Sequence, residues 1–423
     1  MTEAERTRPP RRFYVWLVGA LASTLGDAVM YFALGWAASA HGGAVAGLVL
    51  TAINLPRACL LLVGGTVADR WGARRIMIIG DAAMLVGTAA LAIVSGIFGP
   101  ALWLLIGTGL LVGIKDAFYL PASGTMPLRL VGRSPLPRAM AMRQSGTQAM
   151  TMIAGPLAGT LMAYASLTAA AALNAVTFAA IVVALVAVKP LFDIPPKPDG
   201  GFLHDTTDGL RTAAKDPVLR AAVLLTGGVA GFLLPVLPLL VPLMARQQGW
   251  PATRAGLLFG AQSLALLLTT LVVVKRGTYA RPGAAACAGL LTAAVGVALL
   301  AVPAHVAVSM IAAAIVGVGS AVCASHIGPL VLLRAPQSHV GRVQALLVLV
   351  QSVALLAMNN VLGILADVTT PIVALLTSAA AIALIGVAGL SARRLREAAP
   401  EEDEPAPATD EKPADESAIA HAS

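Results

Sequence analysis

Long runs of apolar residues, separated by short polar segments, dominate the hydrophobic pattern of the chain. A helix needs about 20 predominantly apolar residues to cross the hydrocarbon core of a bilayer. By that measure the pattern predicts twelve spanning helices, near residues 13–39, 43–68, 74–96, 101–122, 138–164, 166–189, 218–246, 252–275, 281–302, 304–333, 340–366 and 369–392. We therefore expect an all-α integral membrane protein.

The amino-acid composition points the same way. Hydrophobic residues make up 58% of the 423 positions and charged residues 12%, and the mean hydropathy is +0.83. A soluble domain carries roughly 25% charged residues, because water must solvate its surface. A chain with half that share must turn most of its surface to lipid, so the lipid bilayer is an expected partner.

The longest internal polar segment, residues 190–217, follows the sixth expected span. It separates two six-helix halves, an arrangement typical of transporters built from pseudo-symmetric repeats. Residues 208–222 have the pattern of an amphipathic surface helix leading into the seventh span. The expected division is an N-terminal tail at 1–12, an N-terminal half at 13–189, a linker at 190–217, a C-terminal half at 218–392 and a C-terminal tail at 393–423.

Lys and Arg are distributed unevenly between the two sets of loops. The loops on the side of the chain termini, together with the N-terminal tail and residues 393–396, hold 22 of these residues, whereas the opposite loops hold only Arg246 and Arg254. Positive residues favour the cytoplasmic side, so we expect a multi-pass protein of the plasma membrane with both termini cytoplasmic. A basic collar against anionic lipid explains the net charge of +8, which therefore does not indicate nucleic-acid binding.

The composition changes again after residue 396. Residues 397–423 contain nine Asp or Glu, one Lys and no aromatic residue. Such a segment cannot bury a core, so we expect a disordered acidic cytoplasmic tail. A solubilising tail and a regulatory tail both fit these residues, and the solubilising role is the commoner one.

Residues 64–75, GGTVADRWGARR, end the second span and form the short connection to the third. Within them the pattern G-x-x-x-D-R-x-G-x-R-R is met by Gly65, Asp69, Arg70, Gly72, Arg74 and Arg75. Gly65 lets the second span approach a neighbour closely, and Gly72 permits a tight turn. A carboxylate at the membrane boundary, such as that of Asp69, can pair with an arginine or cap a helix N-terminus.

This motif and the two-half plan resemble the major facilitator superfamily over nearly the whole chain. The resemblance implies that Asp69 locks the halves in the outward-facing state, with Arg70, Arg74 and Arg75 in support; alternatively, the arginines only fix topology. Residues 23–36 (STLGDAVMYFALGW), 54–70 (NLPRACLLLVGGTVADR) and 216–225 (DPVLRAAVLL) are similar to macrolide-efflux and siderophore-exporter proteins, and 154–159 (AGPLAG) to drug antiporters. The resemblance thus implies a drug:proton antiporter-like branch and leaves the substrate open.

Asp27 is an ionisable residue inside the first span, where such a residue is costly and functional by default. Ser23, Asp27 and Tyr31 recur every four residues, so they share one helix face, which we expect to line a central cavity. Desolvation disfavours the charged form of an isolated carboxylate, and this suits a group that picks up and releases protons. The alternative is that Asp27 neutralises Arg57 of the second span, and the two roles can coexist.

Other polar residues extend the candidate cavity. Thr51, Asn54 and Arg57 repeat every three residues in the second span, and Gln351 lies in the eleventh. We expect these side chains to share the cavity with Asp27.

The third and fourth expected spans also contain charged residues. Lys115 and Asp116 are adjacent, so they point about 100° apart and should face different neighbours. By resemblance, Lys115 is the nearest counterpart of a basic residue linked to proton coupling in family transporters. We expect Asp81 to pair with loop arginines, and His326 to be a packed, hydrogen-bonded residue.

Several catalytic signatures are absent from the sequence. The chain has no Gly-Lys pair, hence no Walker A motif, and neither H-E-x-x-H nor G-x-S-x-G. We expect a monomeric, non-enzymatic protein with no cofactor and no metal, energised by an ion gradient. The favoured function is export of small amphipathic or lipophilic substrates (drug, macrolide or siderophore-like) in exchange for protons by alternating access. A solute importer or facilitator of the same fold, and a non-transporting membrane sensor, are the alternatives.

Overall fold

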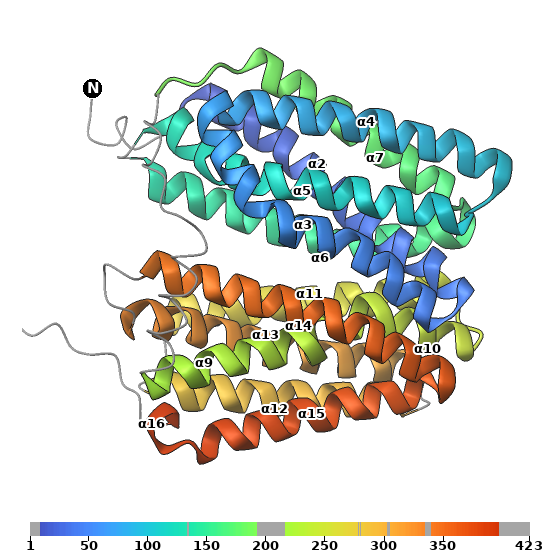
Figure 1. Ribbon diagram of the computed structural model, residues 1–423, viewed down its shortest axis with the longest axis vertical. Coiled ribbons are helices and arrows are strands. Elements are labelled where there is room, and N and C mark those ends of the chain that lie inside the picture. The colour runs from blue at the N-terminus through green and yellow to red at the C-terminus, as the bar shows by residue number, and fades with distance from the viewer. Residues whose placement is uncertain are drawn as a thin grey trace, which may run out of the picture.

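The computed structural model describes residues 9–132, 135–192, 216–277, 279, 281–302, 305–334 and 340–396, all of them in helices or the turns between helices. The first half of the chain forms α2 (Arg11–Ala38), the short η1 (Ser39–His41), α3 (Gly43–Trp71), α4 (Ala73–Phe98), α5 (Leu102–Val131), α6 (Leu136–Tyr164) and α7 (Leu167–Ala187). These helices pack together as one half of the molecule, above the other half in Figure 1.

The second half begins with a segmented span and continues with long helices. The segmented span comprises α9 (Pro217–Gly228), η2 (Val229–Leu233), η3 (Val236–Leu240) and α10 (Val241–Gln247). It is followed by α11 (Ala252–Arg276), α12 (Pro282–Leu300), α13 (Val306–Arg334), α14 (Val340–Val368), α15 (Pro371–Ser391) and the short α16 (Arg393–Arg396). Counting the segmented span once, the described residues form twelve long helices in two groups of six.

Eleven of these helices are long and apolar enough to cross a membrane. The exception is α6, whose mean hydropathy is lowered by Arg138, Arg143, Gln144 and Gln148. The structure therefore confirms the expected all-α membrane fold. Residues 1–8 and 397–423 of the expected tails and 193–215 of the expected linker, including residues 208–215 of the expected surface helix, lie outside the described residues. Residues 217–222 open the seventh span itself.

The seventh span is segmented because of its prolines. Proline lacks the backbone N–H that an α-helix needs, so the hydrogen-bond pattern must shift around it. Both η2 and η3 are single π-helical turns, and they lie on either side of Pro235. Pro238 lies within η3, and Pro242 lies in the first turn of α10. At the start of the span, the Asp216 carboxylate accepts a hydrogen bond from the backbone N–H of Val218 at 2.7 Å and caps the helix.

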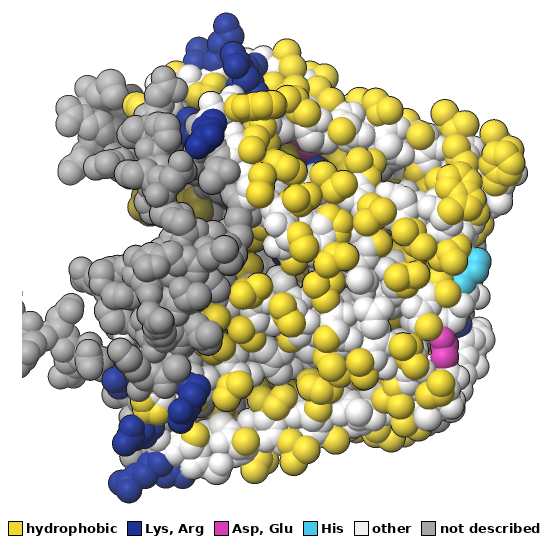
Figure 2. All heavy atoms as spheres, in the orientation of Figure 1, with side chains coloured by type: hydrophobic (Ala, Val, Ile, Leu, Met, Phe, Trp, Pro, Cys, Tyr) yellow, Lys and Arg dark blue, Asp and Glu magenta, His cyan; other side chains and the backbone are white. Residues whose placement is uncertain are grey.

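Apolar and basic side chains divide the surface into zones. Side chains such as Val18, Ile97 and Leu224 are more than two-thirds exposed, and hydrophobic atoms cover the broad middle of the face seen in Figure 2. Lys and Arg gather at one end of that face. We call this end, where α3 connects to α4 and α11 to α12, the basic side, and the opposite end the distal side.

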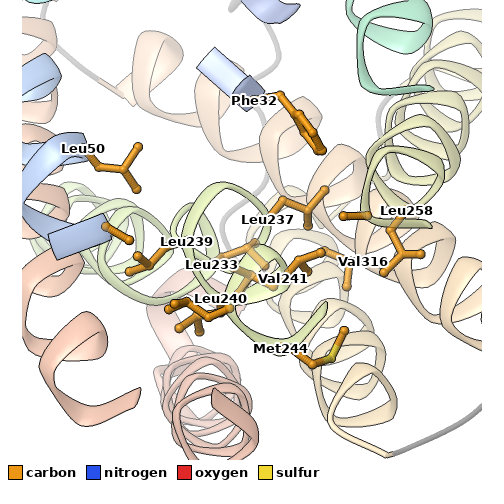
Figure 3. Packing of buried hydrophobic residues seen from close by; sticks show 14 of the residues in the cluster. Phe32, Leu50, Leu233, Leu237, Leu239, Leu240, Val241, Met244, Leu258 and Val316 are labelled. Atoms are coloured by element: carbon orange, nitrogen blue, oxygen red, sulfur yellow. The ribbon is translucent and has the colours of Figure 1, made fainter. Parts of the chain in front are cut away.

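The buried apolar residues show where the two halves meet. One large cluster includes Phe32 of α2 and Leu50 of α3 together with Leu237 of η3 and Leu258 of α11, so it crosses from one half to the other. Figure 3 shows these side chains converging on the segmented seventh span. Toward the basic side the core divides into a cluster within the first half and a smaller one within the second.

Close backbone packing joins the halves on the distal side. A Cβ added to Gly43 of α3 would collide with the carbonyl of Gly363 of α14. Likewise, a Cβ on Gly159 of α6 would lie 2.7 Å from the carbonyl of Ala252 and 3.0 Å from Cα of Gly256 in α11. Small residues allow helices to approach this closely, so the helix pairs α3–α14 and α6–α11 form the seam between the halves.

Candidate functional site

Asp27 of α2 and Lys115 of α5 form an ion pair in the interior of the first half. Lys115 Nζ lies 2.8 Å from Asp27 Oδ2 and 3.4 Å from Asp116 Oδ1. The lysine side chain is 3% exposed, whereas that of Asp27 is 35% exposed. A buried charge must be paired, so the two carboxylates hold the lysine in place while the Asp27 carboxylate remains accessible from outside the pair.

Two aromatic rings complete the surroundings of the lysine. Lys115 Nζ lies 4.5 Å from the ring centroid of Tyr119, one turn further along α5, and 5.3 Å from that of Phe178 in α7. The faces of aromatic rings attract cations. The ammonium group is therefore enclosed by two carboxylates and two rings.

The identity of the Asp27 partner differs from the sequence-based alternative. Arg57 and Asp27 both lie near the middle of their helices, so Arg57 is a candidate partner for the Asp27 carboxylate. In the structure that carboxylate accepts a hydrogen bond from Lys115 instead. Lys115 and Asp116 are expected to face different neighbours, and their side chains also contact each other. Their backbone directions do diverge, yet the flexible lysine stem brings Nζ within reach of Asp27 and of the neighbouring Asp116 at once.

Asp81 of α4 is a third carboxylate near this group. It is 0% exposed, and neither of its oxygens has a hydrogen-bond partner among the described residues. It lies within electrostatic reach of Lys115 and Asp27. The expectation that Asp81 pairs with loop arginines is therefore wrong among the described residues, because the carboxylate is fully buried and accepts a hydrogen bond from none of them.

A cavity of about 300 Å³ lies between the two halves, near the ion pair. Helices α2, α3 and α14 and the seventh span supply its walls, which consist of Tyr31, Leu50, Asn54, Arg57, Leu234, Pro238, Gln351, Ser352, Leu355 and Asn359. Tyr31, Asn54, Arg57 and Gln351 thus share one cavity as expected. Ser23 and Asp27, which are expected on the same wall, are not among the lining residues, and Asp27 lies one turn along α2 from Tyr31. A larger groove of about 690 Å³, between α9, α15 and α16, contains none of the predicted site residues.

Hydrogen bonds fix part of the cavity wall. Asn54 Nδ2 donates to the carbonyl of Leu50 at 2.8 Å and to the hydroxyl of Tyr31 at 3.4 Å. Asn360 Nδ2, from the other half, donates to Thr51 Oγ1 at 2.7 Å. These bonds connect α2, α3 and α14 at the level of the cavity.

The G-x-x-x-D-R motif occupies the α3–α4 connection on the basic side. Gly72 has φ +89°, so the expected tight turn is confirmed. Arg74 caps the end of α7, with Nε donating to the carbonyls of Leu185 at 2.7 Å and Val188 at 2.9 Å. Gly65 and Asp69 belong to α3, and the surroundings of Gly65 and the side chain of Asp69 lie outside what the structure describes.

The remaining motif residues and His326 complete the predicted set. Arg70 and Arg75 are exposed at the basic side. His326 is fully buried, its Nδ1 lies 2.7 Å from the carbonyl of Val322, and Nε2 accepts a hydrogen bond from the Tyr279 N–H. The expectation of a packed, hydrogen-bonded histidine is therefore confirmed.

A carboxylate links the two halves on the distal side. Asp367, at the end of α14, accepts hydrogen bonds from the backbone N–H groups of Gly43 at 2.5 Å and Ala44 at 2.7 Å, the first residues of α3. The N-terminus of a helix has unpaired N–H groups and favours negative charge. Asp367 therefore caps a helix of the opposite half.

An arginine makes a second link nearby. Arg246 of α10 donates from Nε to Ser39 Oγ and from Nη2 to the carbonyl of Trp36, each at 2.7 Å. Its guanidinium also lies 4.5 Å from the Trp36 ring centroid. We call the Asp367 cap and the Arg246 bonds together the distal gate.

The distal gate was not predicted from the sequence. A signal existed, because Asp367 is an acidic residue at the end of an apolar span and Gly42-Gly43 marks the start of a helix. The pairing of these two segments depends on how the halves pack, which no local pattern encodes.

Two six-helix halves with a cavity between them are typical of membrane transporters built from repeats. The chain belongs to the Major Facilitator Superfamily, whose family model matches residues 16–359. Its members are carriers of small-molecule substrates and not enzymes.

Solved structures of transporters share this fold. An auto-inhibited POT family peptide transporter is 15% identical, with a TM-score of 0.74, and the match covers 93% of this chain and 99% of that one. A mutant form of the nucleoside transporter NupG is 12% identical, with a TM-score of 0.73, and the match covers 90% and 99%. At these identities the likeness shows the fold alone. No curated protein matches the chain.

Proposed function

We propose that this protein is a proton-coupled exporter that moves small amphipathic or lipophilic molecules across the plasma membrane by alternating access. The observation that carries the proposal is the Asp27–Lys115 pair. The Asp27 side chain is 35% exposed, whereas the Lys115 side chain is 3% exposed. Asp27 also lies one helical turn from Tyr31, which lines the cavity. A proton can therefore reach the acidic partner without the lysine leaving its site.

Protonation of Asp27 would change the cavity by shifting first Lys115 and then Tyr31. A neutral carboxyl no longer balances the ammonium charge, so Lys115 would shift toward Asp116, whose Oδ1 already lies 3.4 Å from Nζ. A shift of α2 relative to α5 would move Tyr31, whose hydroxyl contacts Asn54 on α3. Proton binding and substrate binding would thus both act on α2, which carries Asp27 and Tyr31.

The conformation fits one end of an alternating-access cycle. The halves are joined at the distal gate, and their cores are separate toward the basic side. With the basic side and both termini in the cytoplasm, as the loop charges indicate, the cavity faces inward. In this proposal Asp69 and its motif arginines lock the halves together in the opposite, outward-facing state.

The proposed direction of transport is supported by a sequence resemblance in α6, in a segment that also forms part of the α6–α11 seam. Gly155 and Gly159 belong to the segment AGPLAG, which resembles a segment of drug antiporters. A Cβ on Gly155 would lie 2.6 Å from Cβ of Phe259 and 2.9 Å from the carbonyl of Gly256 in α11. This segment therefore closes the distal side while the cavity can load from the basic side.

Everted membrane vesicles with an acidic interior and a pH-sensitive dye test the function and its direction together. Adding an exported compound from a panel of anionic, neutral and cationic amphiphiles should release protons and restore the dye fluorescence. Asp27→Asn, expressed to the same level, should abolish this recovery, whereas Asp216→Asn at the α9 cap should retain it. Full recovery in Asp27→Asn would remove Asp27 from the mechanism.

The same vesicles separate the alternatives. A proton-coupled importer would give no fluorescence recovery on outside addition, although it would exchange labelled substrate between the two sides. A membrane sensor would give neither recovery nor exchange with any compound of the panel.

A further inference from the structure

Arg57 places a charge without a counter-ion in the cavity wall. It stands at the middle of α3, it is exposed, and it lines the cavity. No carboxylate among the described residues pairs with it, since Asp27 is bonded to Lys115. An arginine at mid-span is costly and marks a functional site. Its charge is therefore available to a ligand.

The remaining wall residues do not balance this charge. Among the described residues that line the cavity, Arg57 is the single charged one, and the others are apolar, hydroxyl or amide side chains. A cationic ligand would be repelled, and a neutral one would leave the guanidinium unpaired. Guanidinium groups bind carboxylates through two parallel hydrogen bonds. The cavity therefore favours an anionic group at this wall.

The opposite wall holds an unpaired acceptor. Asn359 of α14 is 1% exposed, and its Oδ1 has no hydrogen-bond partner among the described residues. A buried acceptor without a donor is costly and calls for a partner. Leu355 and Ser352 lie one and two turns before Asn359 on the same face of α14 and line the cavity with it. A ligand N–H or O–H at this point would supply the missing donor.

We propose that the substrate is a small amphipathic carboxylate, a deepening that rests on the proposed transport function. Arg57 of the first half binds its carboxylate, Asn359 of the second half binds an N–H or O–H donor, and Leu234 and Pro238 contact its apolar body. A phosphate monoester carries more negative charge than one arginine balances. The volume of about 300 Å³ lies at the lower end of the range of small-molecule sites.

Three probes that share an indole ring test the charge preference on the purified full-length protein. Indole-3-acetate is an anion, indole-3-acetamide is neutral and tryptamine is a cation. We expect the acetate to bind about tenfold or more tightly than the amide, and tryptamine to bind most weakly, in calorimetric titrations. Arg57→Gln should equalise acetate and amide, whereas Arg254→Gln, at an exposed arginine of α11 outside the cavity, should keep the preference.

A fourth probe tests the donor. In 1-methylindole-3-acetate the ring N–H is replaced, so its binding should be weaker than that of indole-3-acetate by about two- to tenfold. In Asn359→Leu the two acetates should bind equally. This double comparison separates loss of the hydrogen bond from a general change in the cavity.

Each outcome decides between the two proposals. Equal binding of acetate and amide, an unchanged acetate preference in Arg57→Gln, or no binding of any probe would overturn the carboxylate site. Selective acetate binding without proton-linked flux would leave the site standing and overturn the exporter. Proton-linked flux of cationic or neutral compounds alone would leave the exporter standing and overturn the carboxylate preference.

Discussion

At the scale of single residues, Lys115 is the charge on which the interior of the first half depends. It pairs with Asp27 and Asp116 and lies within electrostatic reach of Asp81. Removing one partner of a buried pair leaves uncompensated charge and typically costs about 3–5 kcal/mol. We therefore predict that Lys115→Gln markedly lowers the melting temperature of the purified protein.

The double variant Asp27→Asn with Lys115→Gln is the matched control for that prediction. It removes one charge of each sign, so it should recover much of the lost stability while remaining inactive in proton-driven transport. A double variant as unstable as Lys115→Gln alone would mean that the lysine stabilises the half through its ring contacts and not through the ion pair.

The sequence indicated which residues are candidates for the site better than it indicated which of them are in contact. Charges are rare within the spans, so Asp27, Arg57 and Lys115 could be selected from cost alone. Their pairing could not, because sequence gives depth along a helix but not the direction a side chain takes around the bundle. Arg57 and Lys115 both lie near mid-span, and packing decided which one met Asp27.

At the scale of helices, the apolar runs predicted which spanning helices exist better than they predicted where each helix ends. The expected span at 43–68 is α3, Gly43–Trp71, and the span at 101–122 is α5, which continues to Val131. The expected end lies before Pro127, but α5 accommodates both Pro121 and Pro127 inside it. Neighbouring helices re-satisfy backbone groups freed by proline in membrane proteins, so local signals mark such ends poorly.

The Arg74 cap gives a prediction at this scale. Its guanidinium donates to three carbonyls at the end of α7, those of Leu185, Val186 and Val188. Replacing it removes charge-assisted hydrogen bonds worth about 1–3 kcal/mol in total. We predict that Arg74→Gln lowers the thermal stability of the purified protein, and that Arg75→Gln, at an exposed arginine one residue later, changes it little.

A gating role for Arg74 would give a different result. If it acted mainly on the outward-facing lock, Arg74→Gln would leave the melting temperature unchanged and reduce turnover, as we expect for Asp69→Asn. Melting curves and transport rates of these variants, measured side by side, separate helix capping from gating.

At the scale of the whole molecule, the two halves are held together by a shared apolar cluster, by polar contacts on the distal side and by glycine packing along the seam. A structure that must open and close there needs links that are specific but weak. The Asp367 cap meets this need, because it satisfies two backbone N–H groups of α3 without a large apolar interface. Helix caps of this kind contribute about 0.5–2 kcal/mol.

We predict that Asp367→Asn shifts the protein toward a distal-open state by up to about tenfold, since about 1.4 kcal/mol corresponds to that factor. Labelling reports the shift, using Ser352→Cys in the cavity wall as the single cysteine after replacement of Cys59, Cys287 and Cys323. A membrane-impermeant maleimide added to the distal side should label the Asp367→Asn protein faster.

A neighbouring residue provides the control for this shift. Thr369→Val changes an exposed hydroxyl at the same helix end that bonds only to its own helix, at the carbonyl of Leu365. It should label as slowly as the parent protein, because it leaves the cap on α3 intact. Equal labelling rates for Asp367→Asn and the parent would show that the Asp367 cap does not set the equilibrium. Closure of the distal side would then depend on the Arg246 bonds and on the α6–α11 contact, where Gly159 and Gly256 meet, and not on the carboxylate.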